Sequence, residues 1–141
     1  MKKKKKLKRI KKPKLPSISK LNKKLWKACS LFIRTRDHFT CYVCGRKGSG
    51  SQIHAGHLFP QEISNVELKF DARGIRASCY HCNINCGGNG ALMYRKMLEE
   101  FGQSYMDDLY NQLGKNVEWK RLDYETKIEY YEKALSMLKT S

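Results

Sequence analysis

The sequence predicts an α+β fold in which short central strands are flanked by α-helices. Two Cys-x-x-Cys pairs, Cys41/Cys44 and Cys79/Cys82, enclose a segment with strand-like residues. Apolar residues recur at helical spacing on both sides of this centre. At 141 residues, the chain suits one domain and a tail, because domains commonly hold roughly 100–150 residues.

The N-terminal segment is strongly basic. The net charge is +16, and 14 of the 29 Lys and Arg residues lie within residues 1–27, which contain no acid. The rest of the chain carries 15 basic and 13 acidic residues. Like charges repel and little apolar surface can be buried here, so we expect residues 1–19 to form a disordered arm. Residues 20–141 then form a single domain.

This arm is expected to contact nucleic acid. Neutralising phosphates releases counterions, so binding would depend strongly on salt and carry no sequence preference. A solvated tail that only aids solubility is the alternative. The expected contacts are Lys2, Lys3, Lys4, Lys5, Lys6, Lys8, Arg9, Lys11 and Lys12.

The start of the chain is too sparse in apolar residues for a signal peptide or a membrane span. We therefore expect a soluble, cytoplasmic protein that does not bind membranes. A reducing cytoplasm also favours metal binding over disulfides for the six cysteines.

A helix is expected over about residues 20–36, capped by Ser17 or Ser19. Its apolar stripe includes Trp26 and Cys29, and Cys29 is expected to be a buried free thiol rather than a ligand. Its remaining apolar members are Leu21, Leu25, Phe32 and Ile33.

The segment between the cysteine pairs is expected to form a β-hairpin. Residues 52–59 suggest a short strand that Pro60 ends. Further extended segments are expected around a turn at residues 71–74, from the spacing of Leu68, Phe70, Ile75 and Ala77.

Three helices are expected after the second cysteine pair. The first covers about residues 90–101 and ends at Gly102, and the second covers about residues 104–113. Asp123 is expected to cap the third. Helices over about residues 103–139 serve packing or pairing, because the third carries one apolar stripe of Tyr124, Ile128, Tyr131, Leu135 and Leu138.

The four paired cysteines match the pattern in which two knuckles hold one tetrahedral zinc ion. The 34 residues between the pairs exceed the usual zinc-ribbon spacing and leave room for a hairpin, as in a treble clef. Four thiolates leave no coordination position for water, so this zinc would be structural. His81 and Cys86 lie close by in sequence and are expected not to be ligands.

A second set of residues suggests hydrolysis of a phosphodiester. A nuclease of the ββα-metal type needs a neutral imidazole to deprotonate water, a divalent ion and positive charge near the phosphates. His57 and Asn83 could supply the first two, with Arg76 and Arg95 near the phosphates.

On these motifs the sequence resembles the NinG (Rap) recombination nucleases of lambdoid phages, within the wider HNH and endonuclease-VII-like group. The resemblance spans about residues 24–139. It implies a zinc-stabilised treble-clef, HNH-like module. The motifs, in order, are Phe32-Ile-Arg-Thr-Arg-Asp37, Cys41-x-x-Cys44-Gly45, Ala55-Gly-His57, Leu68-Lys-Phe70, Cys79-x-x-Cys82-Asn83, Gly88-Asn89 and Tyr94-Arg95.

The resemblance implies a structure-specific DNA endonuclease acting on branched recombination intermediates of the Holliday-junction, D-loop or flap type. Its partners would be DNA and phage or host recombination proteins, in the cytoplasm of a bacterial host. By position, His57 would be the general base and Asn83 a ligand of the catalytic ion, Mg²⁺ or Mn²⁺.

Three positions depart from the pattern of the group. Gly56 stands where many relatives place a metal-binding Asp, and His54 occupies the acidic position three residues before the base. Gly74 replaces the Asn that normally orients the hairpin. His54 shares the strand parity of Gly56, so its imidazole could reach the ion instead and would favour Mn²⁺, Ni²⁺ or Zn²⁺. A polar or surface role is the alternative for His54.

DNA contacts are expected from Arg76, Arg95 and Asn89, although helix capping would explain Asn89 equally well. A non-catalytic treble-clef nucleic-acid-binding protein is the alternative function, with Gly56 and Gly74 as marks of a decayed site. A zinc-organised adaptor leaves the basic arm unexplained. Resolving a symmetric four-way junction requires two cuts, which makes a homodimer attractive for that substrate.

Overall fold

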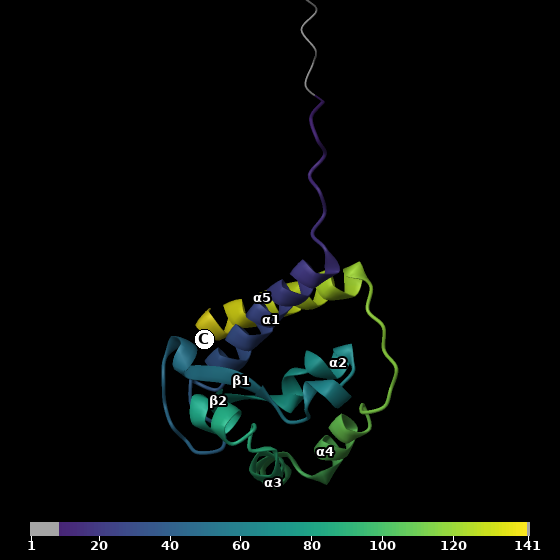
Figure 1. Ribbon diagram of the computed structural model, residues 1–141. Coiled ribbons are helices and arrows are strands. Elements are labelled where there is room, and N and C mark those ends of the chain that lie inside the picture. The colour runs from purple at the N-terminus through teal and green to yellow at the C-terminus, as the bar shows by residue number, and fades with distance from the viewer. Residues whose placement is uncertain (1–8, 141) are drawn as a thin grey trace, which may run out of the picture.

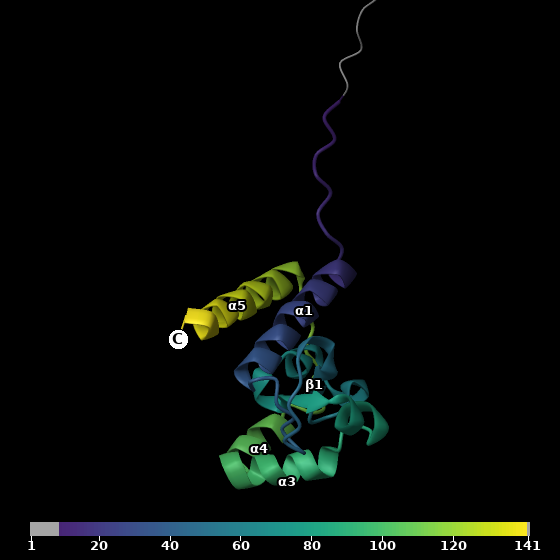
Figure 2. The same ribbon diagram turned by 90° about the vertical axis from the view of Figure 1, so that its left-hand side faces the viewer.

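The computed structural model describes residues 9–140 and shows an α+β arrangement in three layers. Helices α1 (Ile18–Arg36) and α5 (Arg121–Thr140) lie side by side on one side of a two-stranded sheet (Figures 1 and 2). Helices α3 (Gly90–Phe101) and α4 (Gln103–Tyr110) lie on the opposite side. The sheet that positions the candidate site is therefore covered on both faces.

Helix α1 begins where the sequence provides a cap. The Ser17 side chain accepts a hydrogen bond from the backbone N–H of Lys20 at 3.3 Å. The helix thus starts at Ile18, and the arm ends slightly earlier than residue 19. Residues 9–17 lead away from the domain without helix or strand (Figure 1).

Strands β1 (Ile53–His57) and β2 (Ile75–Cys79) form the antiparallel hairpin expected between the cysteine pairs. β1 is shorter than the expected strand over 52–59. The backbone N–H of Leu58 still donates to the carbonyl of Gly74 at 2.8 Å, and the chain then bends towards Pro60, which has no N–H.

The prediction of an extended segment around Leu68 and Phe70 is wrong. These residues lie in and after the short helix α2 (Val66–Lys69), because the Asn65 side chain accepts from the backbone N–H of Leu68 at 2.9 Å and starts a helical turn. Leu68 and Phe70 are both buried, and two buried residues separated by one position also fit the alternation of a strand. The expected turn at residues 71–74 is present as a single 3₁₀ turn.

The C-terminal helices follow the expected pattern with two adjustments. Helix α3 ends at Gly102, which has a φ of 85°, as expected, whereas α4 ends at Tyr110 and continues only as turns. Asp123 lies inside the first turn of α5 and accepts from the backbone N–H of Lys120 at 2.7 Å, so it is not the residue that precedes the helix.

Three clusters of buried side chains hold the layers together. The largest joins the buried faces of α1 and α5, where Leu25, Ile33 and Tyr131 are fully enclosed. A second joins α3 and α4 through Met97 and Met106. The third surrounds the paired cysteines. Among residues 9–140, no helix is long and apolar enough to span a membrane.

Candidate functional site

The four paired cysteines converge on one point. The Sγ atoms of Cys41, Cys44, Cys79 and Cys82 all lie within 4.8 Å of one another. Sulfurs bound to one tetrahedral zinc at about 2.3 Å would be about 3.8 Å apart. The Sγ atoms of Cys44 and Cys79 are 3.6 Å apart, close to that value. The number, type and spacing of the donors therefore suit a structural zinc ion, which this cluster could hold.

Local turns bring the cysteines together. In the first knuckle, the backbone N–H of Gly45 returns to the carbonyl of Cys41 at 2.9 Å, and Gly45 adopts a φ of 74° that favours glycine. In the second, Cys79 ends β2 and Cys82 lies in a π-helical turn over His81–Asn85. The Cys82 N–H points at the Cys79 sulfur at 3.5 Å. Each pair thus directs its thiols to the same side.

The thiols differ in acidity. Burial opposes ionisation of Cys41, but hydrogen bonds from the backbone of Cys44, Cys79 and Val43 outweigh it and lower the Cys41 pKa to about 6. Desolvation raises the Cys82 pKa to about 12. Because zinc binds thiolates, metal binding at this cluster must release protons.

The other cysteines lie outside the four-sulfur cluster, as expected. Cys29 is buried in α1, and desolvation raises its pKa to about 11. Cys86 is exposed and lies 3.4 Å from the Nε2 atom of His81. Neither Cys86 nor His81 belongs to the cluster.

His54 and Asn83 are in direct contact. The Nδ1 atom of His54 lies 3.1 Å from the side-chain nitrogen of Asn83. Two neighbouring ligands of an octahedral ion with bond lengths of 2.0–2.1 Å are about 3 Å apart. The two ends of an Asn amide are exchangeable in assignment, so either the nitrogen or the oxygen can face His54. The two side chains form a hydrogen bond, and its length also matches the separation of two ligands on one octahedral ion.

Gly56 makes room for the Asn83 side chain. A Cβ atom at residue 56 would lie 3.1 Å from the Asn83 Oδ1 and 3.2 Å from the Cβ of Ser78. Both contacts are tighter than ordinary van der Waals contact. The Asn83 side chain therefore lies against the position that a side chain at residue 56 would take. Ser78 is the residue of β2 opposite His54, and its hydroxyl is buried without a hydrogen-bond partner among the described residues.

His57 has the features of a neutral base. Its imidazole stacks on the indole of Trp26, with centroids 5.1 Å apart and planes inclined by 19°. Its Nε2 atom lies 2.8 Å from the carbonyl oxygen of Lys69. A carbonyl only accepts, so Nε2 carries the proton and Nδ1 keeps the lone pair. Burial lowers the pKa of His57 below its usual 6.5, which favours the neutral ring near pH 7.

His54, His57 and Asn83 line one cavity of about 410 Å³, here called the histidine cavity. Its wall also includes Trp26, Ser30, Arg34, Ser51 and Gln61. The two histidines differ in strand parity, yet both line this cavity, which lies at β1, an edge strand among the described residues. His57 and Asn83 also line a hollow that extends to the glycines at residues 87–90.

The hairpin is held by the last residue of α1, Arg36, and by Asp37 directly after it. The Asp37 carboxylate accepts from the backbone N–H of Ala77 at 2.8 Å. Arg36 pairs with Asp37 and donates to the carbonyl of Ile75 at 2.7 Å. The C-terminal end of α1 and the residue after it thus bind the backbone of β2 directly.

The arginine expected at the phosphates from β2 is not available there. Arg76 is buried between the rings of Tyr42 and Phe101 and donates to the hydroxyl of Tyr105 at 3.1 Å. The expectation of DNA contact fails because this side chain points into the domain and fixes α3 and α4 to the sheet. Its Nε atom has no partner among residues 9–140.

Two other expected DNA contacts have different surroundings. Arg95 is 78% exposed and pairs with Glu99 at 3.3 Å, one turn along α3. Asn89 has a φ of 51° and makes no side-chain cap of α3. Its side chain instead forms a hydrogen bond with the Cys82 thiol, so it lies beside the cysteine cluster.

The arm residues are only partly described. Arg9, Lys11 and Lys12 are exposed. The remaining lysines of the expected contact, which are Lys2, Lys3, Lys4, Lys5, Lys6 and Lys8, lie outside the described residues.

Sequence reasoning missed several residues of the histidine cavity. Trp26 was counted with the apolar stripe of α1, yet it is half-buried and faces His57. Arg34 lies within the motif Phe32-Ile-Arg-Thr-Arg-Asp37 but was given no role of its own, and Gln61 belongs to no motif. The signal that could have identified Arg34 was its helical spacing from Lys23, Lys27 and Ser30, which places all four on one face of α1.

Comparisons with known proteins agree on one family. The family model described as "Bacteriophage Lambda NinG protein" matches residues 1–140. A protein named Protein ninG from Salmonella phage P22 is 36% identical over 89 residues, and its namesake from Escherichia phage 933W is 32% identical over 88 residues. The Protein ninG of Escherichia phage lambda is 31% identical over 88 residues.

Each of these alignments covers 62% of this chain and 42–43% of the relative. The aligned part of the chain therefore spans less than half the length of these relatives. No solved structure gives a significant match to this chain.

Proposed function

This chain belongs to the NinG family, and we propose that it is a divalent-metal-dependent endonuclease that hydrolyses phosphodiester bonds in branched DNA. Junctions, D-loops and flaps of the kind formed in recombination would be the substrates. The single observation that carries this proposal is the environment of His57, whose Nε2 is bound to the Lys69 carbonyl and whose side chain lines a cavity shared with His54 and Asn83.

His57 would act as the general base. Its pKa is lowered by burial, so the ring is neutral and ready to take a proton at physiological pH. The Lys69 carbonyl holds the proton on Nε2 and thereby assigns proton transfer to Nδ1. Trp26 fixes the plane of the ring. Among residues 9–140, no group forms a hydrogen bond with Nδ1, so no described residue occupies its lone pair.

Asn83 and His54 would hold Mg²⁺ or Mn²⁺ beside this base. Such an ion stabilises the negative charge that develops on the phosphate and the leaving oxygen. The 3.1 Å separation between His54 and Asn83 supports a shared ion. A nitrogen ligand at this position favours Mn²⁺ over Mg²⁺.

The zinc site would act as the frame of a treble clef. The order of a cysteine knuckle, the β1–β2 hairpin and a helical turn bearing the second pair supports this assignment. Cys82 and Asn83 are adjacent, so a zinc ion at the cysteines would also fix the backbone that presents the Asn83 amide. Structural and catalytic functions are thereby joined in one turn.

The test is a panel of branched and linear DNAs incubated with Mg²⁺, Mn²⁺ or Ca²⁺. We expect cleavage of at least one branched substrate with Mg²⁺ or Mn²⁺, and a loss of about 10²- to 10⁴-fold in His57→Ala, which is the usual contribution of a general base. His38→Asn is the matched control, since His38 is exposed and Asn tolerates its φ of 53°.

Binding of the same DNAs should survive in His57→Ala. Equal cleavage by His57→Ala and the wild type would remove His57 from the mechanism. Salt-sensitive binding without cleavage by any metal would make this a non-catalytic DNA-binding protein.

A further inference from the structure

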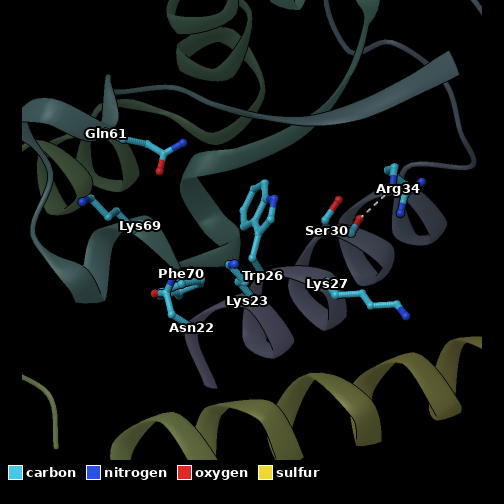
Figure 3. Close-up of a pocket in the computed structure, with 9 residues that line it drawn as sticks. All are labelled: Asn22, Lys23, Trp26, Lys27, Ser30, Arg34, Gln61, Lys69 and Phe70. Carbon is cyan, nitrogen blue, oxygen red and sulfur yellow. Dashed lines mark hydrogen bonds between the residues drawn. The ribbon is translucent and has the colours of Figure 1, made fainter. Parts of the chain in front are cut away.

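A second cavity lies along α1, next to the histidine cavity. This α1 groove has a volume of about 630 Å³ and is lined by residues of α1 together with Gln61, Lys69 and Phe70. Trp26 rises at its centre, with Gln61 and Lys69 on one side and Ser30 and Arg34 on the other (Figure 3). None of the proposed catalytic groups lines this groove.

The groove is basic. Lys23, Lys27, Arg34 and Lys69 all line it, and its wall contains no acidic residue. Within the part of the chain that the structure describes, none of these four side chains forms an ion pair with the protein. Their charges are therefore available to an external anion.

Helical geometry aligns these charges. Lys23, Lys27, Ser30 and Arg34 are spaced by four, three and four residues, which places them on one face of α1. The distance along the helix axis from Lys23 to Arg34 is about 16 Å at 1.5 Å per residue. A single small anion cannot bridge such a track, whereas a polymer with repeated negative charges can.

Arg34 connects the groove to the candidate catalytic residues. Its Nε donates to the carbonyl of Ser30 at 3.2 Å and its Nη1 to the carbonyl of Gly50 at 3.1 Å. The guanidinium is thus fixed by the backbone before any ligand arrives, which reduces the entropy lost on binding. Arg34, Trp26, Ser30 and Gln61 line both the α1 groove and the histidine cavity, so the two are continuous.

The other exposed face of α1 has the opposite character. Lys24 lines a hollow against α5 together with Glu125, Glu129 and Glu132. Its charge is balanced by the acids around it. The face of α1 that leads to the histidine cavity, in contrast, carries positive charge with no acidic residue in the wall of the groove.

We propose that the α1 groove binds the sugar–phosphate backbone of DNA and guides one strand to His57 and Asn83. The choice of DNA as ligand rests on the proposed function. The strand would pass Lys23 and Lys27, meet Arg34 at the mouth of the histidine cavity and present a phosphate beside the general base. The basic arm joins the same helix at Ile18, so both would contact one continuous stretch of backbone.

Binding alone tests this inference. All proteins would carry His57→Ala, so the DNA stays intact whether or not the natural chain cuts it. Affinity for a labelled four-way junction is measured by fluorescence anisotropy at several salt concentrations between about 50 and 300 mM. The slope of log affinity against log salt then reports the number of phosphate contacts. The full chain with its arm is used throughout.

The groove variant is Lys23→Gln/Lys27→Gln. The control of equal charge is Lys24→Gln/Lys133→Gln, because Lys133 is exposed on α5 and neither residue lines the groove. Each lysine that contacts a phosphate contributes about 1 to the slope of log affinity against log salt. We expect the groove variant to lower the slope by about 2, and the control to lower it by less than about 0.5. Equal slopes for the two variants would overturn the inference.

Two further outcomes are decisive. With Trp119→Phe removing the second tryptophan, DNA should change the emission of Trp26 in the control and much less in the groove variant. If polyglutamate of matched charge binds with the same dependence on Lys23 and Lys27, the groove recognises acidic chains in general and the assignment to DNA fails. If the natural chain does not cleave DNA, these binding results still stand. The proposed nuclease activity and the proposed DNA groove can therefore fail separately.

Discussion

The imidazole of His57 lies nearly parallel to the indole of Trp26, with ring centroids 5.1 Å apart. This contact joins α1 to the last residue of β1, two elements that are far apart in the sequence. It buries one face of the imidazole while its Nε2 edge meets the Lys69 carbonyl. The stack and the Lys69 carbonyl therefore orient the proposed base, and the stack contributes to the burial that lowers its pKa.

Removing the indole should change the pH dependence of cleavage. Burial keeps the His57 pKa below 6.5, and the base must be neutral, so cleavage should fall only as pH drops through that lowered pKa. Trp26→Ala admits water, so the pKa should rise towards 6.5 and the acidic limb of kcat/KM should move to higher pH. Trp26→Phe should move it less. An NMR titration of His57 checks the assignment, and an unchanged limb in Trp26→Ala would contradict it.

The same histidine should contribute to stability in a pH-dependent way. Its folded pKa lies below the unfolded value near 6.5, so the unfolded chain takes up the proton first. The contribution is present above pH 6.5 and is lost as pH falls through the folded pKa. We expect the unfolding free energy of the natural chain, relative to His57→Gln, to decrease from pH 7.5 to pH 5.5. Urea denaturation of both proteins at each pH measures it, and a difference independent of pH would refute the effect.

Asp37 should matter more for folding than its place after a helix suggests. Its carboxylate accepts from the Ala77 N–H and from Arg36, and its side chain is only 14% exposed. Asp37→Ala would leave a backbone N–H on β2 without a partner, at a cost of about 2–3 kcal/mol in unfolding free energy. Glu99→Ala is the control, because the exposed pair with Arg95 should contribute below about 0.5 kcal/mol. Comparable losses in both variants would show that Asp37 does not hold the hairpin.

Zinc content should depend on four cysteines and be independent of the other two. Cys44→Ser removes one of the converging thiols, so we expect the bound zinc to fall from one per chain to well below one, with a lower melting temperature. Cys86→Ser should leave both unchanged because Cys86 lies outside the cluster. Elemental analysis and thermal unfolding measure the two properties. Loss of zinc in Cys86→Ser would require a different ligand set.

Much of this fold is readable from local signals in the sequence. The cysteine spacing predicts the cluster because each knuckle closes through bonds within four residues, as between Gly45 and Cys41. The cap at Ser17 and the stripe of α1 likewise depend on neighbouring positions. Leu68 and Phe70 were misassigned because a helical turn and a strand can both bury residues two apart. There, the Asn65 cap was the deciding feature.

The candidate site is less readable because its contacts join distant segments. The sequence identifies His57, Asn83 and His54 as polar residues beside the cysteine pairs. It does not show that Arg76 is enclosed by aromatic rings, since those rings belong to other elements. The stack between Trp26 and His57 is equally non-local. Side-chain direction at such positions depends on packing between layers rather than on spacing.

Gly56 offers the sharpest test of the proposed metal site. A methyl group at this position would lie 3.1 Å from the Asn83 Oδ1, so Gly56→Ala should push the amide away from His54. We expect weaker Mn²⁺ binding and about tenfold slower cleavage, in the range found when a residue supporting a metal ligand is changed. Manganese titration followed by electron paramagnetic resonance measures the affinity directly.

A double-mutant cycle separates this effect from general damage to the strand. In the Asn83→Ala background the displaced amide is gone, so Gly56→Ala should cause little further loss of Mn²⁺ affinity. The zinc content of all four proteins should stay the same, because the cysteine cluster does not include either residue. Additive losses in the double variant would mean that Gly56 acts through the backbone of β1 and not through Asn83. Non-additive losses with unchanged zinc would tie the missing side chain at Gly56 to the amide that takes its place.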